Sequence, residues 1–162
     1  MNGSASVYQD DRRRNRGAGR SYLHIAIDDH TRLAYAELLK DERGTSCAAF
    51  LRRANGWYAD RGITIERVLT DNVKAYHGLD CAQLEIGRRY TKPYRLWTNG
   101  KAEALIKTML REWAYRHTYP TSSHRARALS GWIRWYNNHR PHGSLGALPP
   151  ISRVSHVRGY SS

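Results

Sequence analysis

Cysteine is scarce in this sequence of 162 residues, with Cys47 and Cys81 as its two thiols and no C-x-x-C pair. Two cysteines cannot build a disulfide framework, and their spacing does not suit a zinc finger. Long apolar runs are also missing, because no stretch approaches the roughly 18 uninterrupted apolar residues of a membrane span. The N-terminal region is polar and arginine-rich, unlike a signal peptide. We therefore expect a soluble, cytoplasmic protein without a membrane partner.

Acidic residues are in the minority, with 14 Asp and Glu against 27 Lys and Arg, for a net charge of +13. The rest of the composition, 40% hydrophobic and 25% charged, is that of one ordinary globular domain. Much of the basic excess is arginine, whose planar fork suits phosphate oxygens. This favours a nucleic-acid partner, although a basic surface can also serve solubility alone. A membrane surface fits less well, because no helix gathers its cations on one face.

The first half of the sequence has the pattern of a hairpin, a helix and a strand. Residues 22–27 and 33–39 are apolar or aromatic runs joined by a polar turn at 28–32, which predicts two paired strands. Apolar residues at helical spacing predict an amphipathic helix over 45–59, with Thr45 or Ser46 as its N-cap and Gly62 just past its end. The β-branched run at 63–70 predicts a buried strand, so these elements indicate an α/β sheet.

The second half predicts a short helix at 79–86, a strand at 88–91 and two longer helices. The first long helix is capped by Thr98 or Asn99 and carries an apolar stripe from 102 to 113, and the second spans 123–138. We assign Trp113 and Trp132 to the core and Trp97 to an exposed loop. We expect a basic flexible segment at 1–21, one domain at 22–153 and a disordered tail at 154–162.

The candidates for chemistry are Asp71 and Glu103. Asp71 follows the predicted strand at 63–70, at the edge of an α/β sheet where ligand sites form, and Glu103 lies in the first turn of the next long helix. Two carboxylates on rigid elements can hold one metal ion, and Lys107 and Arg111 follow Glu103 on the same helix flank. From these residues alone, a strand-end turn and a favourable first-turn acid are the preferred explanation of both positions.

Four segments in this order resemble insertion-sequence transposases with a retroviral-integrase-type core. They are residues 22–37, the Val-Leu-Thr-Asp-Asn run at 68–72, the Thr-Asn-Gly-Lys-Ala-Glu run at 98–103 and the Trp-Tyr-Asn-Asn-His-Arg-Pro-His run at 135–142. The resemblance covers about residues 12–153. It implies an RNase H-like α/β fold, a mixed sheet flanked by helices that holds an Asp-Asp-Glu metal triad. In that family Asp71 is the second acid and Glu103 the third.

The resemblance also implies a function, which is DNA transposition by metal-dependent strand cleavage and strand transfer. Two Mg²⁺ or Mn²⁺ ions would activate a water or a 3′-hydroxyl for in-line displacement at phosphorus. The implied partners are mobile-element ends and target DNA, bound by a homo-oligomer. Residues assigned to DNA binding are Asn99, Lys101, Lys107, Arg111 and Arg140, the last of which is equally suited to an internal carboxylate.

The sequence departs from the family pattern at the first acid of the triad. No strand-like segment with a clear acid precedes residue 22, so we expect that strand and its Asp upstream of Met1, with Asp10 as the alternative. Val73 stands where the family usually has Gly, and Ala104 stands where an Arg usually follows the Glu. A non-catalytic DNA-binding remnant is therefore the alternative function. A third possibility is a fragment that folds poorly, because a missing strand exposes the edge at 22–27.

Overall fold

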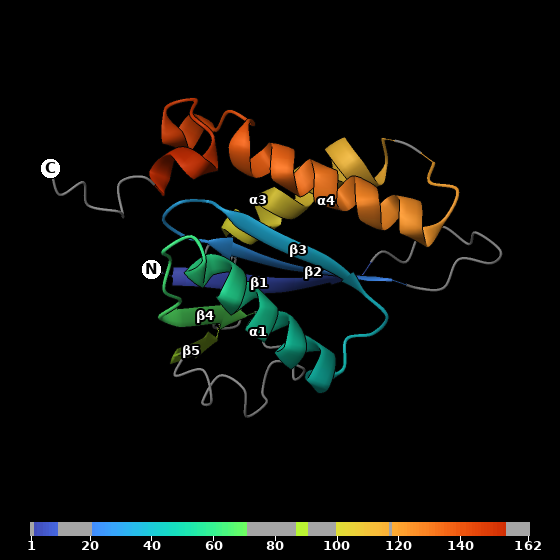
Figure 1. Cartoon of the computed structure of the whole chain (residues 1–162), viewed down its shortest axis with the longest axis horizontal. Helices are drawn as coiled ribbons and strands as arrows, with labels where there is room; N and C mark the ends of the chain where they lie inside the picture. Colours follow the sequence, from blue (N-terminus) through green and yellow to red (C-terminus); the bar gives the residue numbers. More distant parts are fainter. Residues whose placement is uncertain (1, 10–20, 71–86, 91–99, 117, 155–162) are drawn as a thin grey trace, which may run out of the picture.

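The computed structural model describes residues 2–9, 21–70, 87–90, 100–116 and 118–154. These residues form a five-stranded sheet in the order β3-β2-β1-β4-β5, with helices on both of its faces (Figure 1). Its strands are β1 (Asn2–Gln9), β2 (Tyr22–Asp28), β3 (Ala34–Leu39), β4 (Arg67–Thr70) and β5 (Gly87–Tyr90). β1 runs antiparallel to β2 and parallel to β4, and β4 runs parallel to β5. The expected mixed sheet flanked by helices is confirmed.

The central strand β1 corrects two predictions. It pairs with β2 from Gly3 opposite Asp28 to Gln9 opposite Tyr22, and with β4 through Asn2, Gly3 and Ser4. Residues 2–9 are therefore not a flexible segment, and the strand that pairs with β2 lies within the chain rather than upstream of Met1. The exposed edge expected along β2 is covered. The sequence hid this strand because ladder hydrogen bonds use only the backbone, so a run of small polar residues can form it.

Helix α1 (Gly44–Ala59) covers one face of the sheet. Its buried side chains, which pack with Ala26 and Leu33, are Cys47, Phe50, Leu51, Ala54 and Tyr58. The predicted N-caps are wrong, because the helix begins after Arg43 and the Ser46 hydroxyl donates instead to the Asp41 carboxylate at 2.6 Å. The predicted strand at 63–70 is shorter than expected. Only Arg67–Thr70 pairs, while Ile63 and Ile65 are buried beside α1.

The opposite face is covered by α3 (Gly100–Met109), which continues into the π-helical turn η3 (Leu110–Ala114), and by α4 (Ser122–Asn138). Their shared core with β2 consists of Leu23, Ile25, Ile27, Leu105, Met109, Trp113, Leu129, Ile133 and Tyr136. Trp113 is buried as predicted, whereas Trp132 is only partly buried and lies 5.3 Å from the Tyr136 ring. Thr121 caps α4 by accepting from the backbone N–H of His124.

Two short helical turns, η4 (Gly143–Leu145) and η5 (Pro150–Arg153), close the described part of the chain, and η5 contacts α4. Among the described helices, none has the length and apolar character of a membrane span. The predicted helix at 79–86, the exposed Trp97 and residues 155–162 of the tail lie outside the described residues.

Candidate functional site

The exposed flank of α3 carries the predicted acid and two of the predicted cations. Ala102, Leu105 and Met109 face the sheet and are buried, which turns Glu103 and Lys107 outward into solvent. The two side chains are four residues apart and therefore neighbours on one helix flank. Arg111 follows in the π-helical turn and is also exposed. The predicted flank of one acid followed by cations is present.

The carboxylate of Glu103 is free of protein partners within the described residues, since it makes neither a hydrogen bond nor an ion pair there. It is therefore available as an oxygen ligand for a hard cation. Asp71 and Asn99 lie outside the described residues, although β4 ends at Thr70, directly before Asp71. Within the ranges that the structure describes, no three Asp, Glu, His or Cys side chains gather as a metal cluster.

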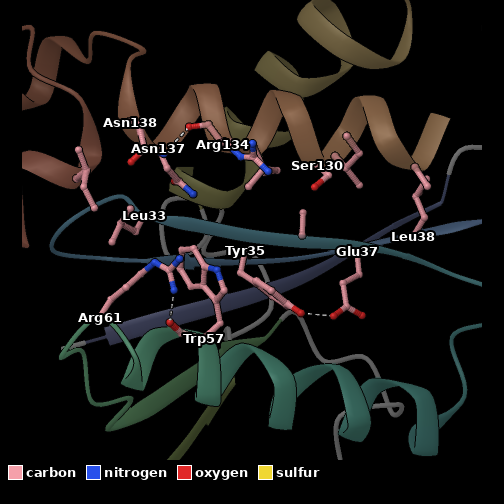
Figure 2. A pocket seen from close by; sticks show the side chains of 15 residues that line it. Leu33, Tyr35, Glu37, Leu38, Trp57, Arg61, Ser130, Arg134, Asn137 and Asn138 are labelled. Atoms are coloured by element: carbon pink, nitrogen blue, oxygen red, sulfur yellow. Dashed lines mark hydrogen bonds between the residues drawn. The ribbon is translucent and has the colours of Figure 1, made fainter. Parts of the chain in front are cut away.

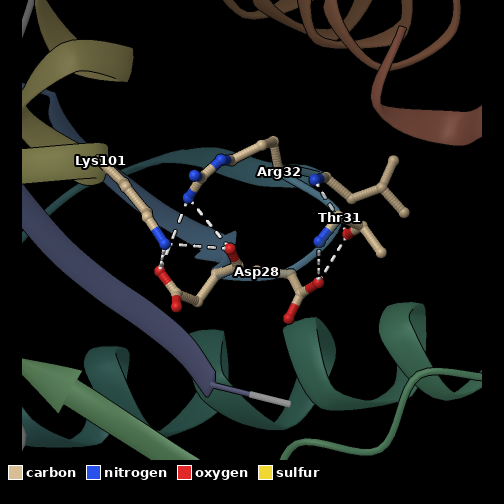
Figure 3. Close-up of polar contacts among 6 residues, drawn as sticks. Asp28, Thr31, Arg32 and Lys101 are labelled. Atoms are coloured by element: carbon tan, nitrogen blue, oxygen red, sulfur yellow. Dashed lines mark hydrogen bonds and ion pairs between the residues drawn. The ribbon is translucent and has the colours of Figure 1, made fainter. Parts of the chain in front are cut away.

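Lys101 lies on the other flank of α3 and binds the turn between β2 and β3. Its ammonium group forms an ion pair with the Asp29 carboxylate and donates to the Asp29 carbonyl at 3.1 Å (Figure 3). Arg32 donates to the same carbonyl at 3.0 Å, and its backbone has a positive φ of 66°. The structure therefore places Lys101 beside the Asp29 carboxylate. This ion pair connects the beginning of α3 to the sheet.

Asp28 organises this turn through its carboxylate. Its carboxylate is buried and accepts from the Thr31 backbone N–H at 2.7 Å and from the Thr31 hydroxyl at 2.6 Å (Figure 3). The Asp28 backbone N–H donates to the Leu33 carbonyl at 2.9 Å, which closes the hairpin. The expectation that Asp28 is a turn residue is confirmed.

Arg140 binds an internal carboxylate, one of the two roles open to it from the sequence. Its guanidinium donates to both oxygens of Glu112 at 3.0 and 3.2 Å, and Arg111 contacts the same carboxylate at 3.2 Å. Burial raises the pKa of Glu112, but the hydrogen bonds from Arg140 and Arg111 outweigh it and hold this pKa below its ordinary value. Sequence reasoning missed Glu112, because its partner is 28 positions away.

A groove of about 290 Å³ separates α3 from the segment that follows α4. We call it the α3 groove, and its lining includes Arg32, Lys101, Ala104, Tyr136, Arg140 and His142. Its three cations outnumber the two carboxylates that pair with them, Asp29 and Glu112, so its wall keeps a net positive charge. Ala104 leaves space because its side chain is only a methyl group. Sequence reasoning missed Arg32 and His142 here, since no local pattern places a turn residue beside the end of α4.

His142 carries an unsatisfied nitrogen beside this groove. Its ring meets the Tyr136 ring edge-on with centroids 4.7 Å apart, and its buried Nε2 has no hydrogen-bond partner among the described residues. Burial lowers the pKa of His142, and the positive charges of Arg140 and Arg32 lower it further. An anion bound in the α3 groove would oppose both cations and raise this pKa.

Comparison with known proteins finds sequence similarity to one family and to two proteins of insertion elements. Residues 84–150 match the family described as Integrase core domain. The chain is 30% identical over 86 residues to an uncharacterized protein of insertion element IS136 from Agrobacterium fabrum, and equally to its counterpart from Agrobacterium tumefaciens. Each alignment includes 51% of this chain and 44% of the relative, so the chain spans less than half the length of these curated relatives.

Two solved structures illustrate the similarity of fold. The catalytic core domain of BIV integrase matches with a TM-score of 0.67 and 14% identity, over 94% of this chain and 93% of that one. A chain of the simian T-cell lymphotropic virus intasome, solved with PP2A regulatory subunit B56 gamma, matches with a TM-score of 0.70 and 20% identity, over 94% and 53% respectively. These likenesses confirm the predicted RNase H-like α/β fold.

Proposed function

We propose that this chain, a transposase/integrase-type protein, forms a catalytic core that cleaves DNA strands and transfers them to target DNA. The observation that carries the proposal is Glu103, an exposed carboxylate without a protein partner in the described residues, on the helix that packs against β1 and β2. It stands at the position that the family resemblance assigns to the third acid of the triad. The proposed substrates are mobile-element ends and target DNA, bound by a homo-oligomer.

Asp71 and Glu103 are the residues that would hold Mg²⁺ or Mn²⁺, since carboxylate oxygens are ligands that these ions prefer. When bound, two such ions activate an attacking water or 3′-hydroxyl and stabilise the leaving oxygen. A third carboxylate is needed, and the eight residues of β1 include neither Asp nor Glu. Asp10, which follows β1 in the sequence, is the candidate within this chain.

The proposed DNA path follows the exposed flank of α3. Lys107 and Arg111 project into solvent beyond Glu103, where they can contact successive phosphates by charge. Lys101 and Arg140 are held by Asp29 and Glu112, so they would contribute through the positive wall of the α3 groove. Asn99 precedes α3 and completes the proposed set of DNA contacts.

The test is nicking and strand transfer on labelled duplex and supercoiled DNA with Mg²⁺ or Mn²⁺. Metal-dependent cleavage should be lost in Asp71→Asn and in Glu103→Gln, and Asp10→Asn tests the third acid. Asp60→Asn and Glu42→Gln are matched controls, because both residues flank α1 on the opposite face of the sheet. Cleavage that persists in both Asp71→Asn and Glu103→Gln would refute the proposed active site.

A second candidate function is DNA binding without catalysis. It is favoured by the absence of an acid from the central strand β1 and by Ala104 beside Glu103. This function predicts salt-dependent DNA binding with no cleavage in either metal, and wild-type affinity in Asp71→Asn and Glu103→Gln. The nicking assay therefore separates the two functions, provided that DNA binding is measured on the same preparations.

A further inference from the structure

The outer edge of β3 is open for part of its length. β3 pairs with β2 on one side, and on the other side the Asn137 side chain accepts from the Ala34 N–H at 2.9 Å and donates to the Ala34 carbonyl at 2.8 Å. Both backbone groups of Ala34 therefore point away from β2. Because this direction alternates along an antiparallel strand, the backbone groups of Ala36 and Leu38 also point outward.

Neither Ala36 nor Leu38 makes an outward backbone hydrogen bond to any residue that the structure describes, and both line a groove of about 600 Å³. We call it the β3 groove. A row of unpaired N–H and C=O groups is a template on which an extended chain can add as a strand. At Ala34 the Asn137 side chain makes the two hydrogen bonds that the backbone of a neighbouring strand would make.

The walls of the β3 groove leave the strand edge between two helices (Figure 2). α4 supplies Ser130 and Arg134 on one side; on the other lie Trp57, near the C-terminal end of α1, and Arg61, which follows that helix. The Arg61 guanidinium lies 3.7 Å from the Trp57 ring centroid and donates to the Trp57 carbonyl at 2.8 Å. The wall on the α1 side is thus an ordered aromatic surface that carries a positive charge.

The charge of the β3 groove is positive. The Arg134 side chain is exposed and makes no hydrogen bond or ion pair with the described residues. The one acid in the lining, Glu37, is neutralised by Arg53, which donates to its two oxygens at 2.8 and 2.5 Å. Among the described residues, Arg134 and Arg61 therefore remain as cations without an ion-pair partner, on opposite walls.

We propose that the β3 groove binds an extended acidic segment of a partner protein, which adds to β3 as a further strand. Its backbone would pair with Ala36 and Leu38, and its acidic side chains would meet Arg134 and Arg61. DNA fits this edge poorly, because phosphates accept hydrogen bonds and cannot donate to the two free carbonyls. A second copy in two-fold pairing would bring the same cations together. This inference goes beyond the proposed function and uses neither Asp71 nor Glu103.

Amide hydrogen exchange measured by NMR tests the open edge in the free protein. The amides of Ala36 and Leu38 should exchange roughly tenfold or more faster than those of Tyr35 and Glu37, which face β2. The Ala34 amide, held by Asn137, should be slow and serves as an internal control. Equal protection along the whole strand would overturn the proposal, because the edge would then already be paired.

A short acetylated and amidated peptide that repeats Val-Asp-Asp-Val is the binding probe, because neighbouring aspartates of a strand point to opposite faces and can reach both walls. It should slow exchange at Ala36 and Leu38, with an affinity that falls as salt rises, whereas the same peptide with lysine in place of aspartate should bind far more weakly. Equal binding of the two peptides would overturn the proposal. The proposal would also be overturned if light scattering showed that the protein alone forms a dimer and the amides of Ala36 and Leu38 were protected in it. A second copy of the chain would then be the occupant of the β3 groove.

Two variants separate the backbone contribution from the charge contribution. Ala36→Pro removes one outward donor, and an edge strand tolerates proline where the N–H points away from the sheet. We expect it to weaken the acidic peptide roughly tenfold, and Arg134→Glu to weaken it about fivefold. Arg116→Glu is the matched charge control, because Arg116 is exposed outside the β3 groove. Wild-type affinity in both Ala36→Pro and Arg134→Glu would overturn the proposal.

Discussion

Replacing Asn137 by alanine should detach α4 from the edge of β3 and destabilise the whole domain. The Asn137 side chain is 3% exposed and forms two hydrogen bonds, at 2.9 and 2.8 Å, with the backbone of Ala34, which is 0% exposed. The contact joins residues that are 103 positions apart. It therefore connects α4 to β3, two elements that are far apart in the sequence.

The magnitude follows from what the substitution leaves behind. Each net hydrogen bond contributes about 1 kcal/mol, and each buried backbone group left without a partner costs about 1–3 kcal/mol. Water can reach part of the adjoining β3 groove, which favours the lower end of that range. We expect Asn137→Ala to lower the free energy of unfolding by about 2–4 kcal/mol.

Urea unfolding followed by far-ultraviolet circular dichroism measures this change. With a slope of about 2 kcal/mol per molar urea for a domain of this size, the midpoint should fall by roughly 1–2 M at an unchanged slope. Asn138→Ala is the matched control, because Asn138 is exposed and donates only to the Arg134 carbonyl in its own helix. If the two variants differ by less than about 0.5 kcal/mol, the reasoning from Ala34 is refuted.

Three further predictions concern charge. Glu112→Gln should cost about 1 kcal/mol at neutral pH. The pKa of Glu112 is lower in the folded state, so the stability that its carboxylate contributes is present above pH 4.5 and is lost as the pH falls further. If the urea midpoint of Glu112→Gln fell in acid by as much as that of the wild type, this prediction would be contradicted. NMR titration of His142 should give a pKa below 6.5 that rises when DNA is added. If the pKa of His142 stays the same with DNA, no phosphate binds in the α3 groove. Lys107→Ala and Arg111→Ala should each reduce the salt slope of DNA binding by about one, whereas an unaltered slope would exclude them from phosphate contact.

Much of the fold is predictable from periodicity in the sequence. The apolar spacing predicted α1, α3 and α4 to within a few residues, and the run of apolar and aromatic residues predicted the β2–β3 hairpin. The Asp28 turn was predictable because its hydrogen bonds to Thr31 lie within four consecutive residues. Glu103 was also predictable, since its exposure follows from the same helical period that buries Leu105.

Other features were decided by the tertiary structure. β1 was missed because its stabilising hydrogen bonds come from β2 and β4, and its own side-chain pattern carries little information. The partners of Lys101 and Arg140 are Asp29 and Glu112, which are 72 and 28 positions away. Part of the β3 edge stays open because, among the described residues, the hydrogen bonds that α4 makes to this edge come from Asn137 and go to Ala34.

The local elements follow from side chains that are close together along the chain, and the net positive charge follows from composition, so both can be predicted without a structure. Which strand is central, which cations are neutralised and which backbone groups remain unpaired depend on how the elements pack. Hydrogen bonds and ion pairs act over a few ångströms in space. Their partners are therefore set by how the elements pack, whereas hydrophobic periodicity reports only which face of each element is buried.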